Sequence, residues 1–207
     1  MQDLEIKDFY KTIDTTVENI LFKEKNSKFI GYAYPITSEN EVKTYIENLK
    51  AAHFSARHWC YAYQLGAETI RFRANDDGEP SNSAGMPIYG QIQSFEITNV
   101  LLVVVRYFGG VKLGVGGLIA AYKTTAQLTL EAADIIEKTI NIHYKITFDY
   151  KNINKVMRVI KEKNIDIVHQ KMELNCEIEI ATRKKNAQQI VDIFTALYEI
   201  TIEEITE

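Results

Sequence analysis

Apolar and polar positions alternate along the first part of the chain in a pattern that predicts paired strands. Residues 17–25 and 27–36 form two such segments around a tight turn at Asn26, and residues 59–65 and 69–74 form a second pair. Residues 100–108 are apolar at both sets of alternating positions. A strand with this composition is buried on both faces, so we expect it in the middle of its sheet.

Two segments in the same region carry apolar residues at helical spacing instead. Ser38 and Glu41 predict a capping box, followed by a helix with Val42 and Leu49 on its buried face. A second helix is expected over residues 115–133, with a stripe of small and apolar side chains along it. Residues 75–87 are rich in Asp, Gly, Ser and Pro, which predicts a loop.

The pattern changes near residue 138. Strands are expected at residues 140–150, 165–170, 173–182 and 200–205, with helices at residues 152–163 and 184–197. This order, β-α-β-β-α-β, is the ferredoxin-like arrangement. The chain is therefore predicted to be an α+β protein with two domains, residues 1–138 and residues 139–207.

Composition limits the classes of function. The chain has 207 residues, 46% of them apolar, and a formal net charge of −4. This charge argues against general coating of nucleic acid and gives no expectation of DNA-specific binding, although it leaves room for a local basic patch. Residues 1–11 lack the apolar core of a signal peptide, and no apolar run is long enough to span a membrane. We therefore expect a cytoplasmic protein in which Cys60 and Cys176 are free, buried thiols.

A glycine-rich segment follows the central strand and provides the first candidate site. Five of the ten glycines lie between Gly109 and Gly117, flanked by Arg106 and Lys112. The segment is neither a Walker A loop nor a dinucleotide fingerprint, because Lys-Ser/Thr and the third glycine of those motifs are missing. Two interpretations stay open: backbone N–H groups that bind an anion or a carboxylate, and a tight loop whose glycines allow close packing.

An acidic turn at residues 75–80 provides the second candidate site. Asp76, Asp77 and Glu79 have the chemistry to hold a hard cation or to receive Arg and Lys side chains, and a solvated Asp-Gly turn is the simplest alternative. His58 and Cys60 share one face of a strand, but no third group in the sequence orients them for nucleophilic catalysis. No catalytic residue, metal ligand or cofactor is predicted.

Three segments together resemble the YigZ/IMPACT family. They are residues 25–30, residues 76–80 with 84–87, and the run from Val103 to Gly117, in which an apolar strand, an Arg and two aromatic residues precede the glycines. The resemblance covers roughly residues 15–135. The remainder of the chain resembles the extra domain of the prokaryotic members, which is similar to domain V of elongation factor G.

The resemblance implies both a fold and a function. It implies an N-terminal domain like the second domain of a small-subunit ribosomal protein, a mixed or antiparallel sheet with two helices on one face. Eukaryotic relatives regulate translation, so we expect a non-enzymatic protein that contacts RNA, the ribosome or a translation factor. The alternatives are an enzyme acting on a phosphorylated or nucleotide-like small molecule in the glycine-loop cleft, and a protein–protein adaptor that uses the C-terminal sheet.

The binding surface is expected where the acidic turn and the glycine-rich loop meet. Asp76 or Glu79 is predicted to contact Arg106 or Lys112, which would bring the two loops into one site. The candidate binding residues are Asp76, Asp77, Glu79, Arg106, Gly109, Gly110, Lys112, Gly114, Gly116 and Gly117, with His58 and Lys123 as neighbours.

Overall fold

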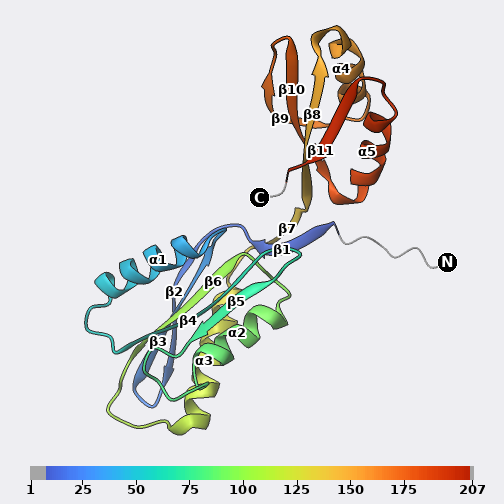
Figure 1. Ribbon diagram of the computed structural model, residues 1–207. Coiled ribbons are helices and arrows are strands. Elements are labelled where there is room, and N and C mark those ends of the chain that lie inside the picture. Colours follow the sequence, from blue (N-terminus) through green and yellow to red (C-terminus); the bar gives the residue numbers. More distant parts are fainter. Residues whose placement is uncertain (1–7, 206–207) are drawn as a thin grey trace, which may run out of the picture. The chain divides into compact units, whose positions relative to one another are not determined.

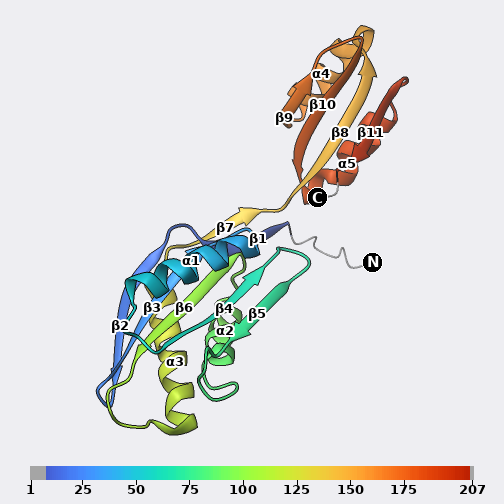
Figure 2. The same ribbon diagram turned by 60° about the vertical axis from the view of Figure 1, so that its left-hand side comes forward.

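A computed structural model describes residues 8–205 of the chain. Within it the chain divides into two compact units, shown in Figures 1 and 2. The first unit is Tyr10–Lys138, and the second contains residues 139–205 together with Asp8 and Phe9. Asp8 groups with the second unit because its carbonyl accepts the backbone N–H of Ile140 at 2.7 Å. The sequence-based division had instead assigned these two residues to the N-terminal domain.

The first unit is built on a five-stranded antiparallel sheet. Its strands lie in the spatial order β2 (Val17–Glu24), β3 (Ser27–Pro35), β6 (Val100–Tyr107), β4 (His58–Leu65) and β5 (Arg71–Asn75). The prediction that β6 lies in the middle of the sheet is confirmed, and every side chain from Val100 to Val105 is fully buried.

Helices cover both faces of this sheet, which corrects the expectation of helices on one face only. α1 (Glu39–Ala52) packs on one face, whereas α2 (Gly85–Ser94) and α3 (Gly114–Glu131) pack on the other. The reason lies in β6, where Leu101 and Val103 face α1 while Leu102 and Val104 face α2 and α3. A strand that is apolar on both faces requires a cover on both faces.

Three elements were not predicted from the sequence. α2 lies partly within the segment interpreted as a loop, and its Gly85, Pro87 and Gly90 are poor helix formers. β1 (Phe9–Ile13) and β7 (Ile135–Thr139) pair as a small two-stranded sheet. By contrast, the capping box of α1 is confirmed, because Glu41 Oε1 accepts the backbone N–H of Ser38 at 2.8 Å and its hydroxyl at 2.9 Å.

The second unit follows the predicted order β-α-β-β-α-β. Its elements are β8 (Asn141–Asp149), α4 (Ile153–Glu162), β9 (Asp166–Lys171), β10 (Asn175–Arg183), α5 (Ala187–Thr195) and β11 (Ile200–Glu204). The strands form an antiparallel sheet in the order β11-β8-β10-β9, and both helices pack on one face around Ile146, Ile178 and Phe194. Cys60 in the first unit and Cys176 in the second are free and buried, as predicted.

The helices of residues 8–205 include none that is both long and apolar enough to cross a membrane. This finding concerns the described part of the chain. Residues 1–7, on which the expectation of no signal peptide mainly depends, lie outside it.

Candidate functional site

Arg106, at the end of β6, joins the two loops that the sequence analysis singled out. Its Nη1 donates to Glu79 Oε1 at 2.6 Å, and the two side chains are only 6% and 4% exposed. On the sheet, Arg106 lies opposite Phe29 of β3 and His58 of β4. The predicted contact between the acidic turn and the glycine-rich loop is therefore confirmed through one buried ion pair.

The Glu79 carboxylate is the centre of a small buried network. Its Oε1 also accepts the hydroxyl of Tyr122 from α3 at 2.7 Å, and Nε2 of His58 lies 3.9 Å away. The Tyr122 oxygen in turn lies 3.3 Å from the Cys60 Sγ. Burial raises the pKa of Tyr122 and the pKa of Cys60, so both groups are neutral at physiological pH. In that form they donate hydrogen bonds and are poor nucleophiles.

The Arg106 guanidinium is enclosed by aromatic rings, and one of its nitrogens has no partner. It lies 5.4 Å from the centroid of the Phe29 ring and 5.6 Å from that of Phe108. Its Nε is buried without a hydrogen-bond partner among residues 8–205. Because buried donors in folded proteins are nearly always paired, this N–H group needs an acceptor.

A cavity of about 350 Å³ opens beside this arginine. Most of the residues around it are apolar, and the charged ones are Glu79, Arg106 and Lys112; the others are Pro80, Phe108, Leu113, Gly114, Val115 and Leu118. α3 begins at this cavity with no capping side chain and no acidic residue in its first turn. The first N–H groups of the helix and the positive end of its dipole are therefore free to receive an anion.

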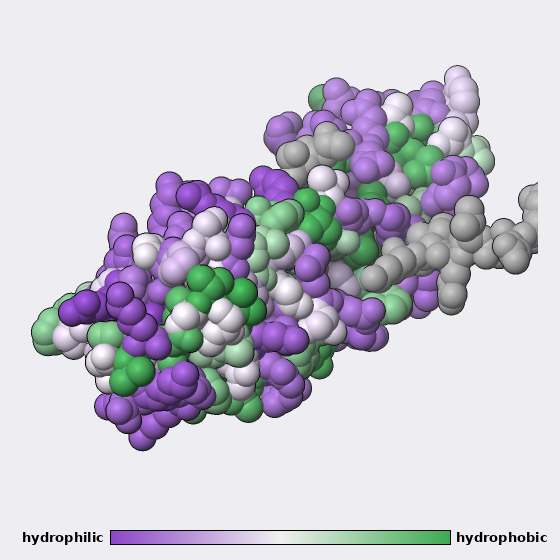
Figure 3. All heavy atoms as spheres, turned by 90° about the horizontal axis from the view of Figure 1, so that it is seen from below, coloured by the Kyte–Doolittle hydropathy of each residue, from purple (hydrophilic) through white to green (hydrophobic). Residues whose placement is uncertain are grey.

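The surface around the start of α3 is also partly apolar. Figure 3 views the end of the first unit at which α3 begins and shows apolar groups among polar ones. Four exposed side chains in this region are Phe108 (41%), Val111 (46%), Val115 (53%) and Ile119 (38%). A partner that brings an anionic group to the cavity would also bury apolar surface here.

The structural constraint that favours glycine differs from one position of the glycine-rich loop to the next. A Cβ on Gly109 would collide with the backbone of Asn26 and Ser27, while Gly110 and Gly114 have positive φ values of 87° and 73°. Gly116 has neither constraint, since a Cβ there would point into open space. Close packing therefore explains Gly109 and a positive φ explains Gly110 and Gly114, whereas the structure gives no local reason for a glycine at position 116.

The other two acidic residues stabilise backbone rather than line the cavity. Asp76 accepts the N–H groups of Asn82, Ala84 and Gly85 at 2.8–2.9 Å, which caps the start of α2. Asp77 Oδ2 accepts the N–H of Trp59 at 2.7 Å. Both are therefore structural in this arrangement.

Of the candidate residues, the cavity brings together Glu79, Arg106, Lys112 and Gly114. His58 lies next to the Glu79 network but does not line the cavity, and its Nδ1 is 2.9 Å from the carbonyl oxygen of Asp77. Lys123 is exposed and does not line the cavity either. The apolar walls of the cavity and the hydrogen bond from Tyr122 to Glu79 were not predicted from the sequence. A tyrosine on the buried stripe of α3 was the available signal, because its hydroxyl needs a polar partner inside the core.

These features define a two-unit α+β protein whose candidate site is an ion-paired cleft between a glycine-rich loop and an acidic turn. The family model described as the Impact N-terminal domain matches residues 25–130. IMPACT family member YvyE of Bacillus subtilis is 31% identical over 91% of this chain and 86% of the relative. An IMPACT family member of Haemophilus influenzae is 30% identical over 82% of this chain and 84% of its own length. The chain belongs to the IMPACT family.

A solved structure shares the fold. The crystal structure of a protein described as hypothetical aligns with a TM-score of 0.73 over 97% of this chain and 98% of that one, at 23% identity. A structure described as the two-domain translational regulator Yih1 aligns with a TM-score of only 0.41, which supports no argument.

Proposed function

We propose that this chain is a non-enzymatic binding protein of the translation apparatus that contacts RNA, the ribosome or a translation factor. Membership of the IMPACT family supports this proposal, given the translational role that the sequence resemblance implies. The proposal includes two resemblances of fold. The first unit would resemble the second domain of a small-subunit ribosomal protein, and the second unit would resemble ferredoxin-like domains such as domain V of elongation factor G. Such fold-level likeness is an analogy, so the site has to supply the argument for function.

The observation that carries the proposal is the open cavity that Arg106 and Lys112 line at the uncapped start of α3. An anionic oxygen of the partner would accept hydrogen bonds from the ammonium of Lys112 and from the first N–H groups of α3. Glu79 already balances the charge of Arg106, so the cavity suits a single anionic group rather than a cluster of them.

The cavity fits binding better than catalysis. None of its lining residues carries a hydroxyl, thiol or imidazole, and the Glu79 carboxylate is held by Arg106 and Tyr122. The neighbouring groups with shifted pKa values are Tyr122 and Cys60. Burial raises both pKa values, so both groups stay protonated and are poor bases and nucleophiles. Apart from Lys112, this space holds no further proton-transfer group or nucleophile of the kind that an enzyme acting on a phosphorylated small molecule would pair with it.

The adaptor alternative gains no support from the second unit. The face of its sheet opposite the helices pairs Lys145 with Glu179 and with Glu203, and Thr147 with Glu177. This face is therefore polar and of mixed charge, neither the apolar patch that a protein partner would bury nor a basic surface for RNA.

Affinity capture of the tagged protein from its own cell extract, with and without RNase, tests the proposal. We expect ribosomal components in the untreated sample, and their loss after RNase would indicate contact through RNA. The substitution Lys112→Glu, at the cavity, should reduce recovery several-fold, whereas Lys43→Glu on α1, across the sheet, should not. Recovery of no ribosomal component in either sample would refute the translation role. Equal recovery with both variants would refute the cavity as the binding site.

A further inference from the structure

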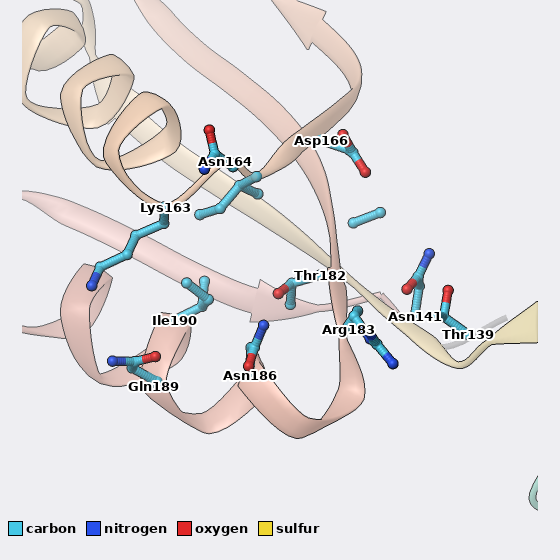
Figure 4. A pocket seen from close by; sticks show the side chains of 12 residues that line it. Thr139, Asn141, Lys163, Asn164, Asp166, Thr182, Arg183, Asn186, Gln189 and Ile190 are labelled. Atoms are coloured by element: carbon cyan, nitrogen blue, oxygen red, sulfur yellow. The ribbon is translucent and has the colours of Figure 1, made fainter. Parts of the chain in front are cut away.

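The first unit contains a second cavity, the α1 cavity, of about 300 Å³, between α1 and the strands β2 and β3. Around a cavity of the second unit, shown in Figure 4, nearly all polar side chains are exposed to solvent. In the α1 cavity, by contrast, the lining tyrosines Tyr32 and Tyr34 are only 3% and 4% exposed. Their hydroxyls are therefore held by partners within the fold rather than by bulk water.

A β-bulge in β2 directs two neighbouring side chains toward this cavity. Glu18 and Asn19 together lie opposite Tyr32 of β3, and Asn19 has a positive φ of 62°. Neighbours on a regular strand point to opposite faces of a sheet, but here both reach the face that α1 covers. Asn19 Oδ1 accepts the hydroxyl of Tyr32 at 2.8 Å, and Glu18 Oε1 accepts that of Tyr34 at 3.4 Å. Bulges that redirect side chains in this way are common beside functional sites.

His53, which follows α1, completes the network without adding a charge. Its Nε2 lies 2.6 Å from the Tyr32 oxygen, and its Nδ1 lies 2.9 Å from the Tyr107 oxygen. Because the Tyr32 hydroxyl donates its one proton to Asn19, it accepts a hydrogen bond from Nε2–H, and Nδ1 accepts one from the Tyr107 hydroxyl. Burial lowers the pKa of His53, which agrees with a neutral ring. His53 therefore brings no positive charge to the cavity.

The Glu18 carboxylate gives the α1 cavity a negative charge. None of the residues around the cavity is a lysine or an arginine, and within residues 8–205 Glu18 forms no ion pair. Tyrosine rings lie beside it: Tyr34 stacks on Tyr45 with centroids 4.0 Å apart, and Tyr32 lies parallel to Tyr34 at 6.3 Å. A carboxylate without a counter-ion and the faces of aromatic rings both attract cations.

We infer that the α1 cavity binds an organic cation through its ammonium or guanidinium group, with Glu18 as the counter-ion and the tyrosine rings beside it. Charge-assisted hydrogen bonds to the carboxylate would fix the cation. A metal ion fits less well, because no group of three or more His, Cys, Asp or Glu side chains in the described part of the chain is placed to hold one. The α1 cavity shares no lining residue with the cavity beside Arg106, so this inference is independent of the proposed function.

Titration of the isotope-labelled full chain with n-butylguanidinium and with n-butylammonium, followed by amide chemical shifts in NMR, tests this inference. n-Butylurea and n-butanol are the controls, because each has nearly the same shape as one of the cations and no charge. We expect saturable shifts confined to the α1 cavity, with Glu18, Asn19 and Tyr45 among the residues affected. The neutral molecules should bind at least about tenfold more weakly. If neither cation shifts these signals, or if the neutral controls shift them equally, the inference is wrong.

Two larger cations distinguish the sources of such a group. Spermidine represents a free amine, and arginine capped as its N-acetyl methylamide represents a side chain of a protein partner. At least one of them should bind as tightly as the butyl cations, and the tighter of the two identifies the source. Weaker binding of both would contradict the inference.

Variants then assign the contacts. Glu18→Gln keeps the shape of the side chain and removes its charge, so it should weaken binding of the cations about tenfold. Tyr45→Leu should weaken it several-fold through loss of a ring. Glu47→Gln, at an exposed position of α1 that does not line the cavity, should leave binding unchanged, and the amide spectrum of each variant shows whether it remains folded. Unchanged binding by Glu18→Gln, or equal weakening by Glu47→Gln, would also refute the inference.

Discussion

Replacement of Glu79 by alanine should destabilise the first unit by about 3–5 kcal/mol, because it leaves the charge of Arg106 buried without a counter-ion. The Arg106 side chain is 6% exposed and its Nη1 lies 2.6 Å from the lost carboxylate, so water cannot readily replace the partner. The Tyr122 hydroxyl loses its acceptor as well, which adds about 1 kcal/mol. With a denaturant slope of about 2 kcal/mol/M, the two losses together should lower the urea midpoint by roughly 2–3 M.

Trp59 makes the measurement specific, because it is the only tryptophan of the chain and lies on β4 of the first unit. Its fluorescence therefore follows unfolding of this unit alone. Lys11→Met is the matched control, since it breaks the exposed Lys11–Glu96 pair of the same unit and should cost less than about 1 kcal/mol. The double variant Glu79→Leu with Arg106→Met should lose less stability than Glu79→Ala, because no charge stays buried. A loss below about 1 kcal/mol for Glu79→Ala would refute this account of the site.

Three further substitutions or treatments test other parts of the structure. Glu41→Ala should cost about 1 kcal/mol at neutral pH. Burial raises the pKa of Glu41, but hydrogen bonds from Thr37 and Ser38 outweigh burial and lower this pKa overall. The stability that Glu41 contributes should therefore vanish as the pH falls through the lowered pKa, and urea unfolding at neutral and acidic pH would measure this loss. Gly109→Ala should lower the melting temperature, whereas Gly116→Ala should leave it unchanged or raise it slightly; equal effects in thermal unfolding would contradict the assignment of their roles. Cys60 should resist alkylation by iodoacetamide in the native protein and react after unfolding in urea, as mass spectrometry would show; rapid native labelling would mean that the thiol is accessible.

The elements that the sequence predicted correctly are those whose signals are local. The helix face of α4, with Val156 and Ile160, and the doubly apolar β6 are both determined by spacing within one segment. α2 was missed because its start is stabilised by Asp76, which lies eight and nine residues before the N–H groups of Ala84 and Gly85. Capping over that distance leaves no pattern next to the helix itself.

In the candidate site, too, some features were predicted from the sequence and others depend on three-dimensional packing. A contact of Asp76 or Glu79 with Arg106 or Lys112 was predicted, but the sequence did not show that the pair would be Glu79 with Arg106. The apolar walls of the cavity arise from the way Phe108 and Leu118 pack in three dimensions, and no spacing rule reports that.

The central position of β6 has a consequence for synthesis of the chain on the ribosome. The hairpins β2–β3 and β4–β5 emerge first, and β6, which joins them, is the last strand of the sheet to be made. Along the edge of β3, Lys28 has no pairing partner until Tyr107 is made, and along the edge of β4, Gln64 has none until Val100 is made. Until then each hairpin exposes an unpaired inner edge that can pair with another chain. The first unit therefore depends on rapid docking of one apolar strand as it leaves the ribosome.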